Sequence, residues 1–367
     1  MSPQKTLVIS AVNFTEGGPL TVLRDCVETA AQVLPDWRII VMAHDAALLQ
    51  TPGIEVRAFP QTKTSWLKRI ALEWVGFKRI SEELDPDLWL SLHDMTPRVK
   101  ARRQAVYCHN PAPFSRPTLR DSWFEPKYLA FALFYTRLYA SFISRNHAVI
   151  VQQQWLREEF QRRFGIRRVI VAYPQTEVAR TDIGRSDARP VRSPVFLYPA
   201  IPRCFKNFEI IGQALAILEQ DPTWSGTVRW TIDGTENRYS RWLKAHFGQL
   251  RSLQWIGRQT KDAMQQEYGR ATSLLFPSRV ETWGLPITEA KQAGLPLLVA
   301  DLPYARETVG SYDQAAFFDP RDPAALASCM RRVSEDLPLF AATCAANPSA
   351  PYAESWPSLL RLLTADL

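Results

Sequence analysis

The sequence has few of the residues that build metal sites and disulfide frameworks. Its five cysteines are an odd number, lie far apart and form no CxxC pair, which is typical of reduced cysteines in a cytosolic protein. These are Cys26, Cys108, Cys204, Cys329 and Cys344. The five histidines show no HxH or HExxH spacing, so no zinc site is predicted. These are His44, His93, His109, His147 and His246.

Other common signatures are also missing. The chain contains neither GxSxG nor GxxxxGK followed by Ser or Thr, so the local signatures of α/β-hydrolases and of P-loop enzymes are absent. The first apolar run has six residues, which is too short for a signal peptide and predicts a first β-strand. The aromatic segment 127–143 spans only 17 residues and contains Arg137, so it does not predict a membrane-spanning helix.

What is present is the composition of a soluble globular protein. Of 367 residues, 46% are hydrophobic and 22% are charged, and this length predicts two domains. The net charge is +7, yet residues 98–180 hold 15 Lys/Arg against 5 Asp/Glu, so the rest of the chain carries about −3. This basic region favours an anionic membrane, nucleic acid or an acidic ligand as partner, or is a solvated surface without one.

Short apolar runs alternate with helical stretches along the chain. Such runs are typical of parallel strands whose two faces are both covered by helices. The first series reads TLVISAV, WRIIVMA, DLWLSLH, QAVYCHN and HAVIVQQ, and the second reads PVFLYPA, VRWTIDG, LQWIGR, TSLLFPS and LPLLVAD. The first helix is expected from about Leu20. An α/β fold of two doubly wound domains is therefore predicted, with their boundary in the polar segment 173–194.

Ligands of open parallel sheets bind at the carboxyl ends of the strands. Four segments follow predicted strands: NFTEGGPL, CHNPAPF, PAIPRCFKNF and SRVETWGLPITEA. In the last of these, Pro286 suits the first turn of a helix and Gly294 its end, which predicts a helix over 286–293. The amides of residues 282–285 can then point outward as an anion site suited to phosphate, and Gly284 lets a ligand approach closely.

Glu281 and Glu289 flank this turn. A glycosidase acid/base pair needs about 5–9.5 Å between its carboxyl groups, whereas eight residues along one helix span about 12 Å. Glu281 precedes the helix, so this comparison leaves their distance open. The anion-binding turn between them favours a phosphate ligand over a glycosidase pair.

The whole stretch FPSRVETWGLPITEAKQAGLPLLVA (276–300) resembles the signature of the retaining glycosyltransferases of family 4, which have the GT-B fold. The resemblance implies two Rossmann-like domains facing a cleft. Residues 1–180 would form the acceptor-side domain and residues 181–345 the domain that binds a nucleotide sugar. Residues 346–367 would form a C-terminal helix that crosses back and packs on the first domain.

The resemblance also assigns roles within this stretch. Glu281 would contact hydroxyls of the donor sugar, and Glu289 would bind the nucleotide ribose. The diphosphate would be held by the amides of Thr282, Trp283, Gly284 and Leu285. Thr282 stands where glycine is usual in the family, so its side chain narrows the approach and can alter the donor preference.

Further motifs carry the resemblance along the chain. Gly17 and Gly18 in GGPLTVL resemble the family's first Gly-Gly loop beside donor phosphate and acceptor, although an ordinary strand-to-helix turn explains them too. His109 in VYCHNPAPF matches a histidine near the donor sugar, whereas a lone histidine is more often structural. Lys206 in PRCFKNF matches the lysine that offsets the charge of the leaving group.

Two other loops match less closely. In the family, an arginine lies about five residues before the lysine, and Ile201 occupies that position here. Either Arg203 reaches the phosphate from a different direction in its place, or the arginine has no counterpart in this chain. In WIGRQTKDAM, the loop whose backbone reads the base corresponds to residues 257–259, with Arg258 as the candidate donor-binding residue.

Several segments have competing interpretations. Segments 64–80 and 127–143 are either helices packed in the first domain or shallow membrane-docking helices, since aromatic and basic residues alternate in the first and aromatic residues crowd the second. Asp-Pro-Asp at 85–87 is read as a helix cap before a strand, not as a metal-binding motif. Trp356 in the terminal helix is expected to be a packing anchor.

The sequence therefore predicts a glycosyltransferase that moves a sugar from a nucleotide-diphosphate donor to a glycan or lipid-linked acceptor, with retention of configuration. It would act in the synthesis of a cell-surface polysaccharide such as lipopolysaccharide, in the cytoplasm or at the inner face of the membrane. The resemblance implies no metal and no cofactor, and no nucleic-acid partner is expected. The alternatives are another GT-B enzyme, such as an epimerase or phosphorylase, and a non-catalytic basic module that binds membranes or nucleic acid.

Overall fold

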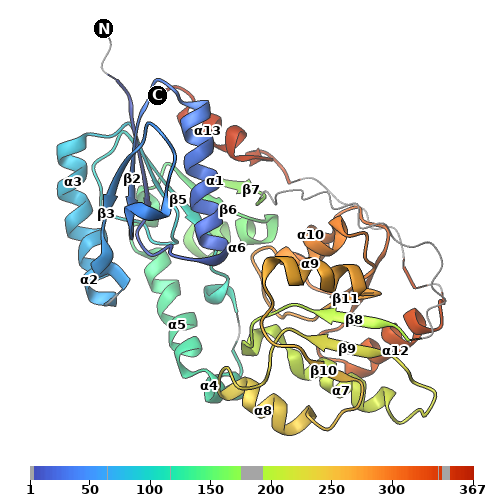
Figure 1. The fold of residues 1–367 in the computed structure, drawn as a ribbon. Coiled ribbons are helices and arrows are strands. Elements are labelled where there is room, and N and C mark those ends of the chain that lie inside the picture. Colours follow the sequence, from blue (N-terminus) through green and yellow to red (C-terminus); the bar gives the residue numbers. More distant parts are fainter. Residues whose placement is uncertain (1–3, 64, 116, 175–192, 338, 341–347) are drawn as a thin grey trace. The chain divides into compact units, whose positions relative to one another are not determined.

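The computed structural model describes residues 4–63, 65–115, 117–174, 193–337, 339–340 and 348–367. The chain forms two compact units (Figure 1). The first unit comprises Met1–Pro113, Leu133–Gln175 and Pro348–Leu367, and the second comprises Phe114–Ala132 and Thr176–Asn347. Most of the predicted boundary segment, 173–194, lies outside the described residues.

The first unit contains an eight-stranded sheet in which every described pairing is parallel. Its order is β14-β7-β6-β5-β4-β1-β2-β3. The strands are β1 (Thr6–Ala11), β2 (Arg38–Ala43), β3 (Glu55–Ala58), β4 (Leu88–Ser91), β5 (Arg103–Cys108), β6 (Ala148–Val151), β7 (Val169–Ala172) and β14 (Tyr352–Ala353). Because strands such as β1 and β4 are buried at every position, helices must cover both faces of the sheet.

Helices cover this sheet on both sides (Figure 1). The elements are α1 (Gly17–Val33), η1 (Ala46–Leu48), η2 (Pro60–Lys63), α2 (Trp66–Ala71), the π-helical turn η3 (Leu72–Gly76), α3 (Phe77–Leu84), η5 (Ile143–Arg145), α6 (Gln154–Phe164) and α13 (Trp356–Thr364). Leu23 of α1 and Leu360 of α13 pack on the face that carries Leu7 and Ile9, while Phe77 of α3 packs on the face that carries Val8.

The C-terminal segment returns to the first unit. Its strand β14 pairs in parallel with β7, and α13 packs against α1. Trp356 is 7% exposed, and its ring stacks on Tyr107 with 5.7 Å between centroids. These contacts confirm the predicted helix that packs back on the first domain and the expectation that Trp356 is a packing anchor.

The second unit contains a six-stranded parallel sheet of order β10-β9-β8-β11-β12-β13. Its strands are β8 (Val195–Tyr198), β9 (Thr227–Trp230), β10 (Leu253–Trp255), β11 (Ser273–Phe276), β12 (Leu297–Ala300) and β13 (Ala315–Phe318). Its helices are α4 (Leu119–Phe124), η6 (Cys204–Lys206), α7 (Phe208–Leu218), α8 (Arg238–Phe247), α9 (Lys261–Arg270), α10 (Leu285–Gln292), α11 (Pro303–Val309) and α12 (Pro323–Ser334). Figure 1 shows α9 and α10 on one side of this sheet and α7, α8 and α12 on the other.

The first unit differs from the predicted domain of residues 1–180 mainly at residues 114–132, and its continuous part ends at Gln175. Residues 114–132 come from the first half of the chain but belong to the second unit, where η4 (Ala112–Phe114) leads into α4. The chain leaves this unit within α5 (Pro126–Ala140), because the division falls between Ala132 and Leu133. Ion pairs of Asp121 and Glu125 and aromatic contacts of α4 hold the segment in the second unit. The local sequence of the segment does not predict these long-range contacts.

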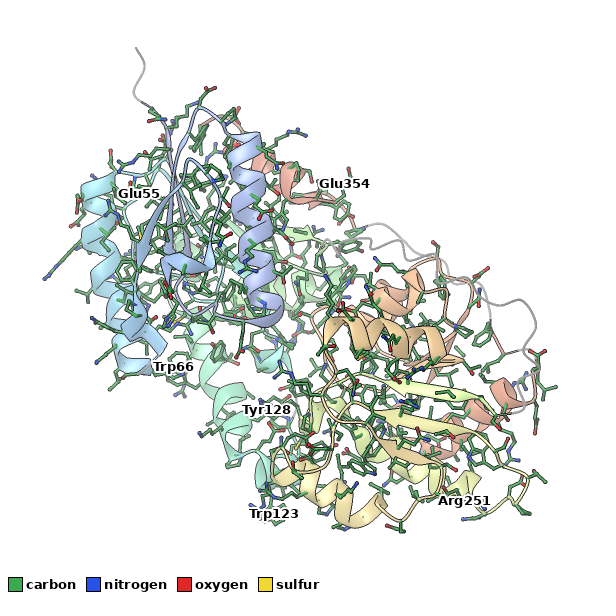
Figure 2. The ribbon with its side chains drawn as sticks, in the orientation of Figure 1. Glu55, Trp66, Trp123, Tyr128, Arg251 and Glu354 are labelled. Atoms are coloured by element: carbon green, nitrogen blue, oxygen red, sulfur yellow. The ribbon has the colours of Figure 1, made fainter. Side chains whose placement is uncertain are left out.

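The Asp-Pro-Asp motif at 85–87 follows the simpler interpretation. Asp85 ends α3 in a left-handed conformation, and the Asp87 carboxylate accepts a hydrogen bond from the Thr6 amide at 2.9 Å, so the Asp-Pro-Asp motif caps a helix and opens β4. Within the described ranges, no helix is long and apolar enough to cross a membrane. Figure 2 shows Trp66 on α2, where its side chain is 38% exposed.

Candidate active site

The turn of residues 281–285, which begins with Glu281, follows the carboxyl end of β11 and leads into α10. Gly284 adopts a left-handed conformation with φ +87° immediately before the helix, and Gly294 does so with φ +66° after it. A Cβ atom on Gly284 would lie 3.1 Å from Cε1 of Phe276, so the backbone conformation favours glycine there and a larger residue would crowd the Phe276 ring. The helix spans Leu285–Gln292, one residue earlier at each end than the predicted 286–293.

Hydrogen bonds of Trp283 fix the backbone of this turn, while some of its amides have no protein acceptor in the part that the structure describes. Trp283 is buried, its ring nitrogen donates to Oγ1 of Thr288 at 2.9 Å, and its carbonyl accepts from the Thr308 hydroxyl. Among the described residues, the amides of Thr282 and Gly284 donate to no protein acceptor. Together with the positive end of α10, these amides make a site for an anion.

Lys206 and Glu281, predicted from separate motifs, form an ion pair in the second unit. Their side chains are 14% and 13% exposed, so water screens the pair only in part. Lys206 ends η6, and the Tyr198 hydroxyl donates to its carbonyl. The following residue, Asn207, has φ +58° and donates through its side chain to the carbonyls of Pro277 and Pro320. The lysine is thus fixed beside the turn that follows β11.

Glu289 is exposed on α10, where one of its oxygens accepts a hydrogen bond from the Tyr268 hydroxyl at 2.6 Å. Burial, and then the nearby Glu289 carboxylate, raise the pKa of Tyr268 well above its usual value, so this hydroxyl remains a donor. The second oxygen of Glu289 has no hydrogen-bond partner in the described part of the chain. Glu289 therefore presents one acceptor to solvent from a side chain whose position is fixed.

The two less closely matched loops also lie in the second unit. Arg203 forms an ion pair with Glu125 at 2.7 Å, while Ile201 is 64% exposed. In the loop after β10, Gly257 has φ +69° and Arg258 is exposed. The Gln259 side chain instead turns back on its own loop and donates to the carbonyls of Ile256 and Gly257.

Three predicted residues lie in the first unit. Gly17 and Gly18 are exposed and begin α1, three residues before the expected start at Leu20. Gly17 has φ +66°, which favours glycine, while a Cβ on either residue would meet no atom within 4 Å. His109 follows β5; its side chain is 23% exposed and lies in edge contact with Phe14, with 5.4 Å between ring centroids.

Asp94 organises the loop that carries His109, and the sequence prediction missed it. It is buried with φ +64°, and one carboxylate oxygen accepts from the amides of His109 at 2.7 Å and Asn110 at 3.1 Å and from the Tyr139 hydroxyl at 2.8 Å. The same oxygen lies 3.8 Å from Nδ1 of His109. Its place just after β4 was the signal available, because polar residues there lie at the ligand-binding edge of the sheet.

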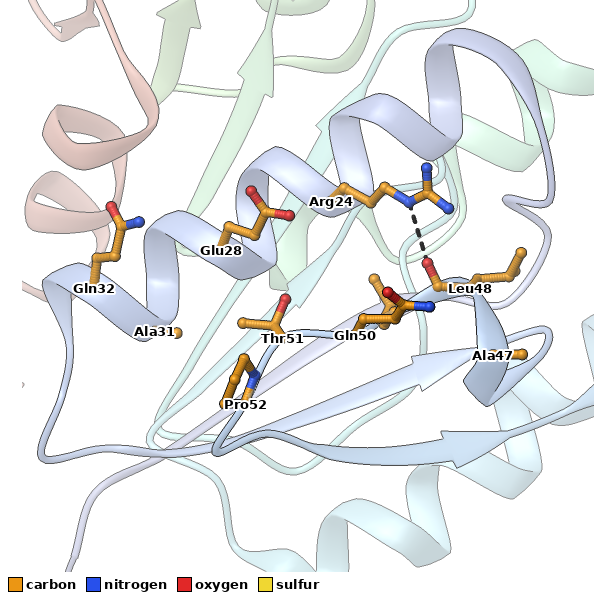
Figure 3. Close-up of a pocket in the computed structure, with 10 residues that line it drawn as sticks. Arg24, Glu28, Ala31, Gln32, Ala47, Leu48, Gln50, Thr51 and Pro52 are labelled. Atoms are coloured by element: carbon orange, nitrogen blue, oxygen red, sulfur yellow. Dashed lines mark hydrogen bonds between the residues drawn. The ribbon is translucent and has the colours of Figure 1, made fainter.

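A separate cavity of about 660 Å³ lies along α1 (Figure 3). Arg24, Glu28 and Gln32 of the helix face the loop 47–52 across it, and Nε of Arg24 donates to the Leu48 carbonyl at 3.1 Å. The cavity is lined by none of the residues predicted from the sequence motifs.

A buried charged cluster lies elsewhere in the first unit. Glu73 in the π-helical turn is fully buried, 3.1 Å from Nε2 of His93 and 4.0 Å from Nε of Arg69. Burial raises the pKa of Glu73 to about 8, against the opposing effect of Arg69. Burial, followed by the Arg69 charge, lowers the pKa of His93 well below its usual value. At neutral pH the cluster therefore favours a protonated glutamate beside a neutral histidine.

Comparison with known proteins agrees with this architecture. Residues 181–343 match the family model described as "Glycosyl transferases group 1". The serotype-specific mannosyltransferase WbdA of Escherichia coli is 28% identical over 105 residues, which make up 29% of this chain but only 12% of the length of that relative.

Solved structures resemble the chain over most of its length, among them the following two. The lipopolysaccharide outer core galactosyltransferase WaaB, in its apo form, has a TM-score of 0.64 at 16% identity, covering 99% of this chain and 96% of its own. HepE of Anabaena, in complex with UDP and glucose, has a TM-score of 0.58 at 16% identity, covering 90% of each chain. The predicted fold class is confirmed: the protein has an α/β fold of the GT-B type, with two Rossmann-like units.

Proposed function

We propose that this protein is a retaining glycosyltransferase of family 4. It transfers a sugar from a nucleotide-diphosphate donor to a glycan or lipid-linked acceptor in the synthesis of a cell-surface polysaccharide. The observation that carries the proposal is the Lys206–Glu281 pair beside a turn with outward amides. A sugar diphosphate needs positive groups for its phosphates and a carboxylate to accept from its hydroxyls, and both are present here.

Donor binding exchanges the partners of this pair. The Lys206 ammonium and the amides of residues 282–285 take the diphosphate, and the Glu281 carboxylate becomes an acceptor for the sugar hydroxyls. Glu289 takes a ribose hydroxyl on its second oxygen, while Arg258 lies on the loop assigned to the base. Gly17, Gly18 and His109 remain candidates for the sugar and phosphate by their resemblance to the family's motifs.

In the transfer step the bond between the sugar's anomeric carbon and the diphosphate oxygen breaks, and the diphosphate leaves with the electron pair. The acceptor hydroxyl attacks the same face and gives its proton to a leaving phosphate oxygen. No protein nucleophile is assigned. Lys206 and the turn amides stabilise the charge that develops on the leaving group, in a position where water screens it incompletely.

We assign no metal or cofactor to this reaction. The residues that would meet the diphosphate are an ammonium group and backbone amides, which neutralise phosphate charge directly. Activity is therefore expected to survive an excess of EDTA. A loss of turnover that Mg²⁺ or Mn²⁺ restores would contradict this part of the proposal.

The acceptor side is proposed to work at the inner, cytoplasmic face of a membrane. Trp66, Leu67, Leu133 and Phe134 expose 38%, 78%, 67% and 52% of their surface in the first unit, and the rings of Trp66 and Tyr135 lie 5.9 Å apart. Exposed basic residues lie among the segments that carry them: Lys68, Lys78, Arg79 and Arg137. Sedimentation with anionic but not neutral vesicles, reduced in Leu67→Asp, tests this contact.

The central test is thermal unfolding with UDP, GDP, dTDP, ADP and CMP in parallel, since HepE was solved with UDP. The matching nucleotide sugar is then supplied with candidate acceptors, and the anomeric configuration of the product is read by NMR. Glu281→Ala is expected to abolish turnover while the unfolding transition persists. Near-normal turnover in a folded variant would reject the role of Glu281, and an inverted product would reject the retaining assignment.

A further inference from the structure

The loop that carries Lys206 is held by a helix from the other half of the sequence. Glu125, just after α4, accepts a hydrogen bond from the Cys204 amide at 2.7 Å and forms an ion pair with Arg203 at 2.7 Å. Its side chain is 14% exposed. The amide it binds belongs to the first residue of η6, and Lys206 is the last residue of that turn.

Asp121 acts on the same loop through Arg279. The Arg279 guanidinium donates to the Asp121 carboxylate at 2.7 Å and to the Cys204 carbonyl at 2.7 Å, and the Arg279 amide donates to the Phe205 carbonyl at 2.8 Å. Asp121 is 4% exposed, and the Asp121 carboxylate raises the pKa of Arg279 against the opposing effect of burial. Both backbone groups of Cys204 are therefore fixed by charged side chains.

The helix itself is anchored on α8. Phe124 is 7% exposed, and its ring lies 5.5 Å from Tyr239 and 5.4 Å from Trp242, measured between centroids. The Arg238 guanidinium lies 3.4 Å from the ring centroid of Trp123 and donates to the Trp123 carbonyl at 3.0 Å (Figure 2 labels Trp123). Asp121 also closes the capping box of α4: its carboxylate accepts a hydrogen bond from the Thr118 amide, and its own amide donates to the Thr118 hydroxyl.

We propose that Glu125 and Asp121 are positioning residues that hold the Cys204–Lys206 turn in the place where Lys206 meets the donor diphosphate. The two carboxylates do not contact the donor. They fix the backbone of Cys204 and Phe205, and the turn then places the ammonium group beside Glu281. This inference rests on the proposed function, because it assigns the support of the same phosphate-binding lysine.

Two opposing effects make the proposal testable. If Glu125 acts only through its charge, its removal leaves Arg203 unpaired and tightens the binding of a diphosphate. If it acts through the backbone hydrogen bond, Glu125→Ala loosens the turn and weakens binding, while Glu125→Gln keeps an acceptor for the Cys204 amide. We expect the Kd of the nucleoside diphosphate that stabilises the wild type to rise about tenfold in Glu125→Ala, in line with the loss of one charged hydrogen bond. Glu125→Gln is expected to restore it to within about threefold of the wild-type value.

The experiment is calorimetric titration of the full chain with that nucleoside diphosphate, below the unfolding range of every variant. Asp221→Ala is the control, because Asp221 also pairs with an arginine of the second unit, Arg331, whose side-chain exposure of 38% is close to the 42% of Arg203. Asp121→Ala and Asp121→Asn repeat the comparison through Arg279. In a Lys206→Ala background, Glu125→Ala is expected to change Kd no further, which a general loss of folding would not reproduce.

An unchanged Kd in Glu125→Ala, or tighter binding in both Glu125 variants, would overturn the positioning role. An equal additional loss in the Lys206→Ala background would do the same, because the effect would then not pass through the lysine. A wild type that binds none of the nucleotides contradicts the proposed function instead, so the two failures are distinguishable.

Discussion

Replacement of Lys206 by alanine tests the donor site most directly. The Lys206 side chain is 14% exposed and its ammonium group lies 5.6 Å from the ring centroids of both Phe205 and Phe276, so its contact with a diphosphate is only partly screened by water. A charge-assisted hydrogen bond of this kind contributes about 1.5–3 kcal/mol, so the variant is expected to bind the nucleotide roughly 10–150-fold more weakly.

Thermal unfolding measures this loss without knowledge of the acceptor. A nucleotide at about 100 times its Kd adds roughly 2.7 kcal/mol to the wild-type protein, or several degrees in Tm at about 2–4 °C per kcal/mol. If Lys206→Ala weakens binding about 30-fold, the same concentration is about 3 times the new Kd and adds only roughly 0.8 kcal/mol. The shift in Tm is then expected to fall to about a third.

The control and the refuting outcome follow from the same geometry. Lys127→Ala removes an exposed lysine of the same unit and is expected to keep the full nucleotide shift. Without nucleotide, Lys206→Ala is expected to unfold at lower temperature, because Glu281 is left partly buried without its cation. A full nucleotide shift in Lys206→Ala would refute the contact between this lysine and the diphosphate.

Three further predictions concern the turn, the buried cluster and the C-terminal anchor. Gly284→Ala is expected to destabilise the second unit more than Gly294→Ala in urea unfolding, because both positions have positive φ but only at Gly284 would the new Cβ meet Phe276, at 3.1 Å; equal losses would contradict the packing argument. In the folded state the pKa of Glu73 is raised to about 8. At pH values between the unfolded-state pKa and the folded-state pKa, only the folded state keeps the proton on Glu73, so the free energy of unfolding falls as the pH rises. Between pH 6.5 and 8, the free energy of unfolding of wild type is expected to fall by about 1 kcal/mol per pH unit relative to Glu73→Gln, because the titration of His93 in the unfolded state is common to both proteins and cancels; parallel curves would exclude the titration of Glu73. Trp356→Ala is expected to destabilise the first unit by about 3–5 kcal/mol while the nucleotide-induced shift persists, since Trp356 packs on Tyr107 in that unit; a lost nucleotide shift would contradict this separation.

The strands were largely predictable from local sequence. Each of the ten apolar runs identified in the sequence overlaps a described strand, because a parallel strand buried on both faces must be apolar at nearly every position. Four described strands were not identified, and two of them, β7 (VIVA) and β13 (AAFF), carry the same apolar signal. The other two lack it. β3 reads EVRA at the edge of its sheet, and β14 has only two residues, which become a strand by pairing with β7.

The individual residues of the candidate site were predictable from the sequence, but the contacts between them were not. Gly284, Pro286 and Gly294 predict the turn and the helix because their backbone preferences act locally. The contact between Lys206 and Glu281 joins residues 75 positions apart, and it needed the family resemblance to suggest it and the fold to place it. Glu289 was predicted, but its hydrogen bond with Tyr268 was not.

By itself, the sequence determined the two parallel sheets, the glycine-dependent turn and the identity of the chemical groups near it, because these depend on periodicity and on backbone conformation over a few residues. Tertiary structure alone decided that residues 114–132 join the second unit, and that Asp121 and Glu125 hold the turn of Lys206. It also decided that Asp94 organises the loop of His109. A carboxylate has no local preference that reveals its partner, because the energy of an ion pair or hydrogen bond depends on distance and burial, which only the folded chain sets.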